Sequence, residues 1–193
     1  MAPPRKHETD AILDATRALV LAEGPRAASV AAIAKVSGAP AGTLYHRFGN
    51  RNGVLTAAWL RALERFQSRA MSAVGADPVE VAVAMAVAAI GFARSVPDDA
   101  RLLLTLRPSD LLDGEPDSQF TATLAAMNAP LIERIHELAR GIFGSDDARS
   151  MDAISRAVVD LPYAVVRRHA NDAELPAWLE EDLADAARRL LVR

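Results

Sequence analysis

Apolar side chains recur at helical spacing in one segment of this chain after another, and this pattern restricts the fold more than any other feature. In residues 9–23, Ile12, Ala15, Leu19 and Val20 fall on one stripe of a helix. Alanine, the strongest helix former, supplies much of the 51% hydrophobic content, whereas glycine (10) and proline (11) are sparse. No segment carries the alternation and turn of a β-hairpin. We therefore expect an all-α chain of about nine helices.

Turn residues divide this pattern into a head and a body. After the first helix, Ser29 can cap a second helix that must end at Gly38. A third helix covers residues 40–49, and a long fourth one follows to about residue 74. Later helices are expected from Pro78, Asp98, residue 117, residue 146 and Pro176, with interruptions at Pro130 and Pro162. The expected domains are a helix-turn-helix head, residues 1–53, and a helical bundle joined to it by the fourth helix, residues 54–193.

Composition excludes several classes of protein. The absence of cysteine excludes disulfides, thiolate catalysis and cysteine zinc sites. The N-terminus lacks the apolar region of a signal peptide. The most apolar stretch, residues 78–93, carries Glu80 and is shorter than the roughly 20 residues of a spanning helix, so we expect a buried core helix. These observations predict a soluble, cytoplasmic protein.

Charge is unevenly divided, although the net charge is only −3. Residues 1–69 hold ten Lys and Arg against five Asp and Glu, and residues 70–193 hold twelve against twenty. A positive head on an acidic body is typical of a protein whose head meets a polyanion.

Two short helices with a glycine turn between them, preceded by a supporting helix, form the pattern of a helix-turn-helix. The apolar stripe of the third helix consists of Ala41, Leu44 and Phe48. At about 100° per residue, His46 lies nearly opposite the middle of this stripe, with Gly42 and Thr43 beside it. A catalytic or metal cluster normally points into a pocket, whereas these side chains point away from the core. The pattern therefore favours a surface that reads a partner.

Basic residues flank this segment. Arg51 opens the fourth helix, where the helix dipole disfavours a cation by a few tenths of a kcal/mol, and a nearby phosphate would reverse that sign. Arg5, Lys6 and His7 precede the first helix in what we expect to be a flexible arm, placed to reach a DNA backbone or minor groove.

The segment SVAAIAKVSGAPAGTLYHRFGNRNGVL, residues 29–55, resembles the DNA-binding segment of TetR-type transcriptional regulators. In that family the recognition helix carries the pattern gtlY-x-x-F, which is matched by Gly42, Thr43, Leu44, Tyr45 and Phe48. The chain departs from the family at Arg51, where lysine is usual, at Asn52 and Gly53, where acidic residues are common, and at Pro40, which replaces a polar cap. The resemblance implies a regulator that binds double-stranded DNA, with an effector pocket in its body. We expect the DNA-binding residues to be Arg5, Lys6, Ser29, Lys35, Pro40, Ala41, Gly42, Thr43, Tyr45, His46, Arg47 and Arg51.

Pairs of histidine and carboxylate occur in the chain but do not indicate a metal site. His7, His136 and His169 each have one carboxylate three residues away, and none has a second histidine at helical spacing. Because no catalytic arrangement or phosphate loop is present either, we expect no enzyme activity, cofactor or metal.

Two prolines interrupt the expected helices of the body. Pro130 and Pro162 each cost roughly 3 kcal/mol in a helix interior and can splay helices apart. Thr121, Thr123 and Asn128 lie near these kinks and could supply polar groups to an apolar pocket. We expect a small, largely apolar effector there, and otherwise ordinary core. The expected lining consists of Met85, Phe92, Leu103, Leu106, Phe120, Leu124, Met127, Asn128 and Tyr163.

The last two helices carry apolar faces that could pair with a second copy of the chain in a four-helix interface. The expected interface consists of Ile154, Val158, Leu161, Val165, Leu179, Leu183, Ala186 and Leu190; internal packing is the alternative. A homodimer is favoured because one short recognition helix binds too weakly for operator specificity.

The sequence thus predicts a ligand-released repressor that acts as a homodimer on a palindromic operator. One alternative keeps the DNA-binding head but gives the body a protein partner in place of a ligand. Another is a helical-bundle enzyme or lipid-binding protein with a coincidental helix-turn-helix.

Overall fold

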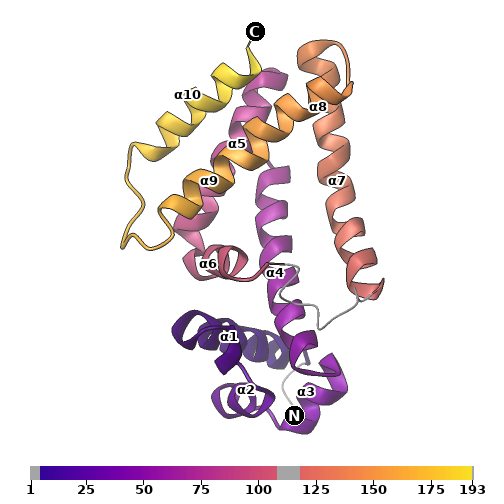
Figure 1. The fold of residues 1–193 in the computed structure, drawn as a ribbon, viewed down its shortest axis with the longest axis vertical. Helices are drawn as coiled ribbons and strands as arrows, with labels where there is room; N and C mark the ends of the chain where they lie inside the picture. The colour runs from indigo at the N-terminus through magenta and orange to yellow at the C-terminus, as the bar shows by residue number, and fades with distance from the viewer. Residues whose placement is uncertain (1–4, 108–117, 193) are drawn as a thin grey trace. The chain divides into compact units, whose positions relative to one another are not determined.

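A computed structural model describes residues 5–107 and 118–192, and all regular structure in these residues is helical, as the sequence predicts (Figure 1). If the continuous run α8–η3–α9 is counted as one helix, the described residues form nine helices. The elements are α1 Arg5–Glu23, η1 Pro25–Ala27, α2 Val30–Ser37, α3 Ala41–Phe48, α4 Arg51–Met71, α5 Pro78–Ser95, α6 Pro97–Thr105, α7 Ser118–Phe143, α8 Ala148–Ser155, η3 Arg156–Asp160, α9 Leu161–Arg168 and α10 Leu179–Leu191.

The first helix begins earlier than expected. α1 starts at Arg5, whereas the sequence suggested a flexible arm up to about Thr9. Arg, Lys and Glu are good helix formers, so the residues after the two prolines extend the helix by a turn. The side chains of Arg5 and Lys6 lie outside the described part of the chain.

The chain divides into two compact units, which do not coincide with the expected domains. Unit 1 comprises Met1–Leu63 and Asp98–Thr121, and unit 2 comprises Glu64–Pro97 and Ala122–Arg193. The expected boundary after residue 53 falls inside α4. Residues beyond it belong to unit 1 because Trp59 donates from Nε1 to the carbonyl oxygen of Leu106 at 3.1 Å and meets the Phe120 ring edge-on at 6.3 Å.

Unit 1 is built around one apolar stripe from each of its helices. Ile12, Ile33, Leu44 and Leu55 are each at most 1% exposed. The predicted turn residues of α2 are confirmed. Ser29 Oγ accepts from the backbone N–H of Ala32 at 3.2 Å, and Gly38 ends the helix at φ 71°, in the left-handed region that favours glycine.

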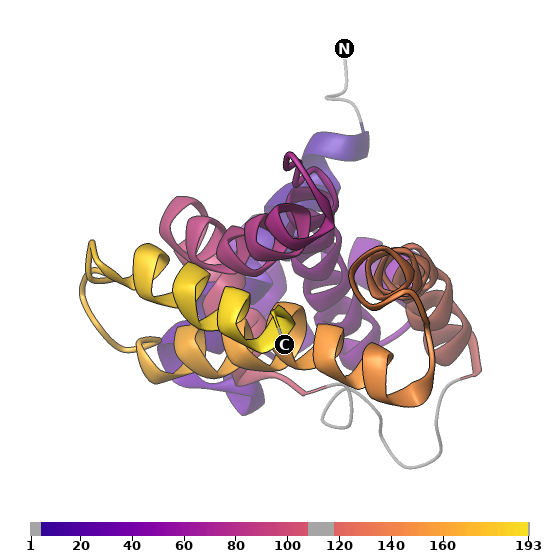
Figure 2. The ribbon, with the colours of Figure 1, turned by 90° about the horizontal axis from the view of Figure 1, so that it is seen from above.

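Unit 2 packs α5, α9 and α10 side by side, as both views of the ribbon show (Figures 1 and 2). Their shared core takes in Met85 of α5, Ile154 of α8 and Leu191 of α10, all at most 3% exposed. Among the described residues, α5 is the one helix long and apolar enough to cross a membrane by length and composition. Eight of its side chains are buried inside the protein, as predicted for a core helix.

The two prolines of unit 2 have different effects. α7 continues through Pro130 from Ser118 to Phe143, so the expected interruption there is absent. Before Pro162, by contrast, the helix widens into the π-helical turn η3, and the backbone N–H of Leu161 donates to Arg156 O, five residues back. Proline has no N–H and its ring clashes with the carbonyl four residues earlier. The wide turn accommodates both defects without ending the helix.

Candidate nucleic-acid interface

The third helix presents one side to the core and the other to solvent, as the sequence predicts. Leu44 is 1% exposed, whereas Tyr45 is 56% exposed and His46 is also exposed. The helix ends at Gly49, whose φ of 75° needs glycine and whose backbone N–H donates to Tyr45 O at 2.9 Å. A helix of eight residues with polar side chains on its open side can enter a groove of a partner molecule.

The turn and the helix before it continue this exposed surface. Pro40, Ala41 and Gly42 are exposed at the start of α3, and Thr43 is half-buried there. Lys35 is exposed in the last turn of α2. Pro40 makes no side-chain hydrogen bond to the helix, so the first N–H groups of α3 have no side-chain cap.

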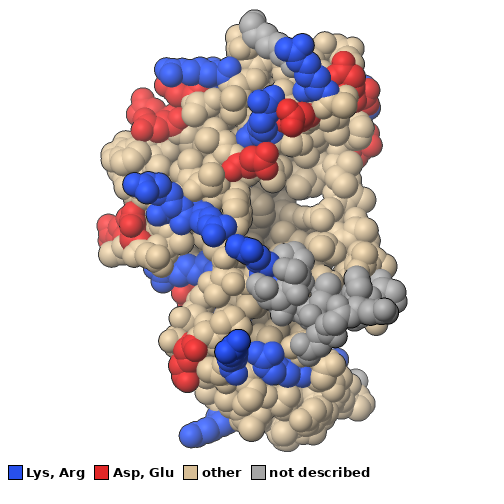
Figure 3. Space-filling model, viewed as in Figure 1, with Lys and Arg blue, Asp and Glu red and all other residues tan. Residues whose placement is uncertain are grey.

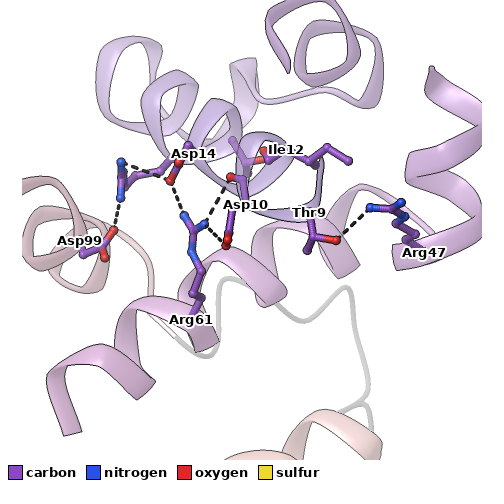
Figure 4. Close-up of polar contacts among 9 residues, drawn as sticks. Thr9, Asp10, Ile12, Asp14, Arg47, Arg61 and Asp99 are labelled. Atoms are coloured by element: carbon purple, nitrogen blue, oxygen red, sulfur yellow. Dashed lines mark hydrogen bonds and ion pairs between the residues drawn. The ribbon is translucent and has the colours of Figure 1, made fainter. Parts of the chain in front are cut away.

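Two of the expected DNA-binding arginines form hydrogen bonds within unit 1. Arg47 is half-buried and donates from Nη1 to Thr9 Oγ1 of α1 at 2.9 Å (Figure 4). Arg51 is also half-buried; its Nε donates to Ala28 O at 3.0 Å and its Nη2 to Pro25 O. These side chains hold α3 and α4 against the rest of the unit.

A chain of ion pairs crosses α1, and sequence reasoning missed it. Arg61 of α4 contacts Asp10 at 3.0 Å and Asp14 at 2.6 Å, and Asp14 also lies 3.4 Å from Arg17 (Figure 4). Arg17 in turn pairs with the buried Asp99 of α6. Asp10, Asp14 and Arg17 occur at spacings of four and three residues on one face of α1, which is the only trace of this chain in the sequence.

The residues expected to line an effector pocket differ in exposure. Met85, Phe92, Leu106 and Phe120 are buried, and the half-buried ones are Leu103, Leu124, Met127 and Asn128. Asn128 Oδ1 accepts from Gln67 Nε2 at 2.7 Å within unit 2. Tyr163 does not fit the expectation. It is 46% exposed on α9, where its hydroxyl accepts from Arg167 at 3.1 Å.

Half of the residues expected at a dimer interface lie in the core of unit 2 instead. Ile154, Val158, Leu179 and Leu183 are each at most 7% exposed, because α5 and its neighbours cover them. A side chain buried within one protomer has no surface left for a second copy, so the expectation is corrected for these four. Of the rest, Leu161, Val165 and Ala186 are half-buried and Leu190 is 40% exposed.

Other apolar side chains of this region are open to solvent. Val159 and Tyr163 lie on the η3–α9 run, and Leu190 and Val192 lie at the end of α10, each 39–62% exposed. We call these four the outer apolar face. In Figure 3, both acidic and basic side chains lie over the region of α8, α9 and α10.

The histidines of unit 2 pair with carboxylates. His136 Nδ1 lies 3.0 Å from Asp146 Oδ2, and Arg140 donates to the same oxygen at 2.8 Å. These two hydrogen bonds hold the pKa of Asp146 below its ordinary value. Among the described residues, no group of three or more His, Cys, Asp or Glu side chains is placed to hold a metal ion.

Comparison with known proteins agrees with this geometry. Residues 12–58, which include α2, α3 and the start of α4, match the family described as "Bacterial regulatory proteins, tetR family". No curated protein sequence matches the chain.

Solved structures of bacterial transcriptional regulators match nearly the whole chain. A TetR family transcription regulator from Marinobacter aquaeolei VT8 is 18% identical, with 97% of this chain and 96% of that one covered and a TM-score of 0.74. A TetR-like transcriptional regulator from Rhodococcus sp. RHA1 is 19% identical over 98% and 96%, with a TM-score of 0.70. The fatty acid degradation regulator FadR from Bacillus halodurans is 19% identical over 94% and 96%, with a TM-score of 0.64. At these identities the likeness establishes the fold.

Proposed function

We propose that the protein is a homodimeric repressor that reads a palindromic operator through α3 and releases it when an effector binds in the body. Two observations support this proposal: residues 12–58 match the family "Bacterial regulatory proteins, tetR family", and the chain shares the fold of solved TetR-type regulators. The observation that carries the DNA-reading role is the division of α3 into a buried side and an exposed side with Tyr45 and His46.

In this proposal the DNA-binding residues of the head divide into two groups. Thr43 and His46 contact base edges in the major groove, and Gly42 lets the backbone approach the DNA closely. Lys35, Tyr45, Ser29 and the N-terminal Arg5 and Lys6 contact phosphates, with Pro40 and Ala41 lying against the backbone. Arg5, Lys6 and Lys35 carry the positive charges of this group, so their contacts with phosphates weaken as the salt concentration rises.

Selection of bound sequences from a random duplex pool tests the proposal directly. We expect one near-palindromic sequence to be enriched, with half-sites about 34–36 Å apart or a multiple of that spacing. His46→Ala and Thr43→Ala are expected to relax base preference within each half-site by about 1–3 kcal/mol. A loss of affinity that is equal on selected and random duplexes would show that these residues do not read bases.

We place the dimer contact on the outer apolar face, Val159, Tyr163, Leu190 and Val192, with the half-buried Leu161, Val165 and Ala186 at its edge. These side chains leave apolar surface uncovered in the single chain, which supports burial against a second copy. The exposed charged residues are Arg156, Asp160, Arg167 and Arg168 on the η3–α9 run, and Glu181, Asp182, Asp185 and Arg189 on α10. Because the first set is positive on balance and the second negative, we expect one protomer's α9 to pair with its partner's α10.

For the effector we propose a small, largely apolar molecule held by unit 2, with Met127 and Leu124 as walls and the Asn128–Gln67 pair as the polar contact. The shared fold of the fatty acid degradation regulator is consistent with an apolar ligand.

Fluorescence anisotropy of the operator in the presence of fatty acids of graded length tests this proposed effector site. We expect release by some of them and a shifted response in Met127→Ala, with ligand-free operator affinity unchanged. Release by none of them, or an unchanged response, would count against this pocket.

A further inference from the structure

Arg51 occupies a junction between the helices of the head. It is the first residue of α4, and only Gly49 and Asn50 separate it from the end of α3. Two of its hydrogen-bond partners, Ala28 and Pro25, lie 23 and 26 residues earlier, in the turn between α1 and α2. One side chain therefore connects the start of α2 with the point where α3 passes into α4.

All three nitrogens of the Arg51 guanidinium donate hydrogen bonds. Nε donates to Ala28 O at 3.0 Å, Nη2 donates to Pro25 O, and Nη1 donates to Asn52 Oδ1 at 3.0 Å. Ala28 immediately precedes Ser29, the cap of α2. The charge is thus directed at the carbonyl oxygens of the turn that starts α2, and the side chain is half-buried there.

From this geometry we infer that Arg51 is a positioning residue for DNA reading and not a phosphate contact. It holds the start of α2 and the start of α4 together, and so sets the orientation of α3, which lies between them in the chain. The inference rests on the proposed DNA-binding function. It replaces the expectation that Arg51 neutralises a phosphate.

Lysine would not fill this role. A guanidinium is planar and directs its donors along fixed directions, so it can hold two carbonyl oxygens and an amide oxygen at once. An ammonium group is a point charge on a flexible stem and cannot span these three acceptors together. A phosphate contact, by contrast, would be retained by lysine because it needs only the positive charge.

Asn52 completes the arrangement. It is 9% exposed; its Oδ1 accepts from Arg51, and its Nδ2 has no hydrogen-bond partner among the described residues. A buried amide held by one hydrogen bond and otherwise unsatisfied is costly, so its orientation depends on Arg51. The first turn of α4 is therefore organised by contacts within the protein.

The experiment uses the full chain, the duplex selected from a random pool, and a random-sequence duplex of equal length. Arg51→Lys and Arg51→Met are compared with Lys35→Met, which removes an exposed charge of α2. We expect both Arg51 variants to lose at least about tenfold in affinity for the selected duplex, the size of one lost base contact. We also expect the slope of log K against log salt to equal that of the wild type, whereas one lost phosphate contact lowers it by about 0.9. The affinity for the random duplex is expected to change much less.

A second measurement on the wild type covers the case in which both variants unfold. We expect the Nε hydrogen of Arg51 to exchange with solvent at least about tenfold more slowly than that of the exposed Arg26, and to be unaffected by the random duplex.

Wild-type binding by Arg51→Lys, a slope reduced by about 0.9 in Arg51→Met, or fast exchange at Nε would each overturn the inference and leave the proposed function standing. A wild-type protein that enriches no duplex would overturn the proposed function, and this inference with it.

Discussion

At the scale of single residues, Gly53 shows how closely α4 approaches α3. A Cβ added at Gly53 would lie 1.9 Å from the carbonyl oxygen of Phe48, a backbone atom that cannot move away. We expect Gly53→Ala to destabilise the protein by about 2–3 kcal/mol, as overpacking does. Urea unfolding followed by circular dichroism measures the change.

Gly42 provides the matched control for that substitution. It is also helical, but nothing lies within 4 Å of a Cβ placed there. We expect Gly42→Ala to raise the free energy of unfolding by about 0.5–1 kcal/mol, since alanine is the better helix former. Equal effects of the two substitutions would show that the contact with Phe48 does not restrict position 53.

Residue positions on a helix could be predicted from the sequence, whereas residue partners could not. The 100° rotation per residue correctly placed Leu44 inward and His46 outward, because both depend only on local geometry. Arg47 and Arg51 were both expected on DNA, and their partners within the protein lie 38, 26 and 23 residues away. No periodicity carries information about contacts of that separation.

At the scale of helices, the ion pair between Arg17 and Asp99 attaches α6 to α1. Asp99 is 1% exposed, so its carboxylate is almost fully removed from water. Loss of the Asp99 charge leaves the half-buried Arg17 with the longer contact to Asp14 at 3.4 Å, and we expect Asp99→Asn to cost about 3 kcal/mol of stability. The free energy of unfolding in urea measures this cost.

The double variant Asp99→Leu with Arg17→Met tests whether the cost comes from the unpaired charge. Replacing both partners by apolar residues is expected to restore most of the stability, since a buried ion pair barely offsets its own desolvation. A double variant as unstable as the sum of the two single ones would indicate that the pair contributes nothing as a pair.

Hydrogen bonds at the connection between α7 and α8 make the stability of the protein depend on pH. Folding lowers the pKa of Asp146 through its hydrogen bonds with His136 and Arg140. A carboxylate with a lowered pKa stabilises the fold above its unfolded pKa of about 4, and this contribution disappears as the pH falls through the folded pKa. We therefore expect wild type and Asp146→Asn to differ most near neutral pH and to converge in acid. Unfolding by guanidinium chloride across this pH range measures the difference, and a constant difference at every pH would refute it.

The effect of a proline on its helix was only partly predictable. Both Pro130 and Pro162 were expected to interrupt helices, and only Pro162 produces a change of helix type. Pro162 is buried among packed helices and Pro130 is exposed, a difference that tertiary packing decides. The helices themselves and the caps of α2 followed from local pattern, and they are confirmed.

At the scale of the whole molecule, the sequence could not separate core from interface in the last two helices. An apolar stripe at helical spacing has the same appearance whether its own chain or a second copy covers it. Ile154 and Leu183 therefore fitted a dimer interface in the sequence, and the fold places both in the core of unit 2. The side chains that remain exposed, such as Val159, lie next to charged residues in the sequence, so they do not form a clear apolar stripe.

The contrast between buried and exposed apolar residues in the last helices allows a test of the proposed dimer that separates assembly from folding. Val159→Glu with Leu190→Glu places two charges on the outer apolar face, where both side chains already reach solvent. We expect this variant to keep its helical circular dichroism and melting temperature, to sediment as a monomer at micromolar concentration, and to lose the selected operator. Leu183→Glu, which places a charge at a site only 2% exposed, is expected instead to unfold, because a buried, unpaired carboxylate costs several kcal/mol.

A dimer that survives the outer substitutions would move the interface to another surface. A wild-type monomer would remove the geometric reason for a palindromic operator, since two-fold symmetry in the DNA mirrors two-fold symmetry in the protein.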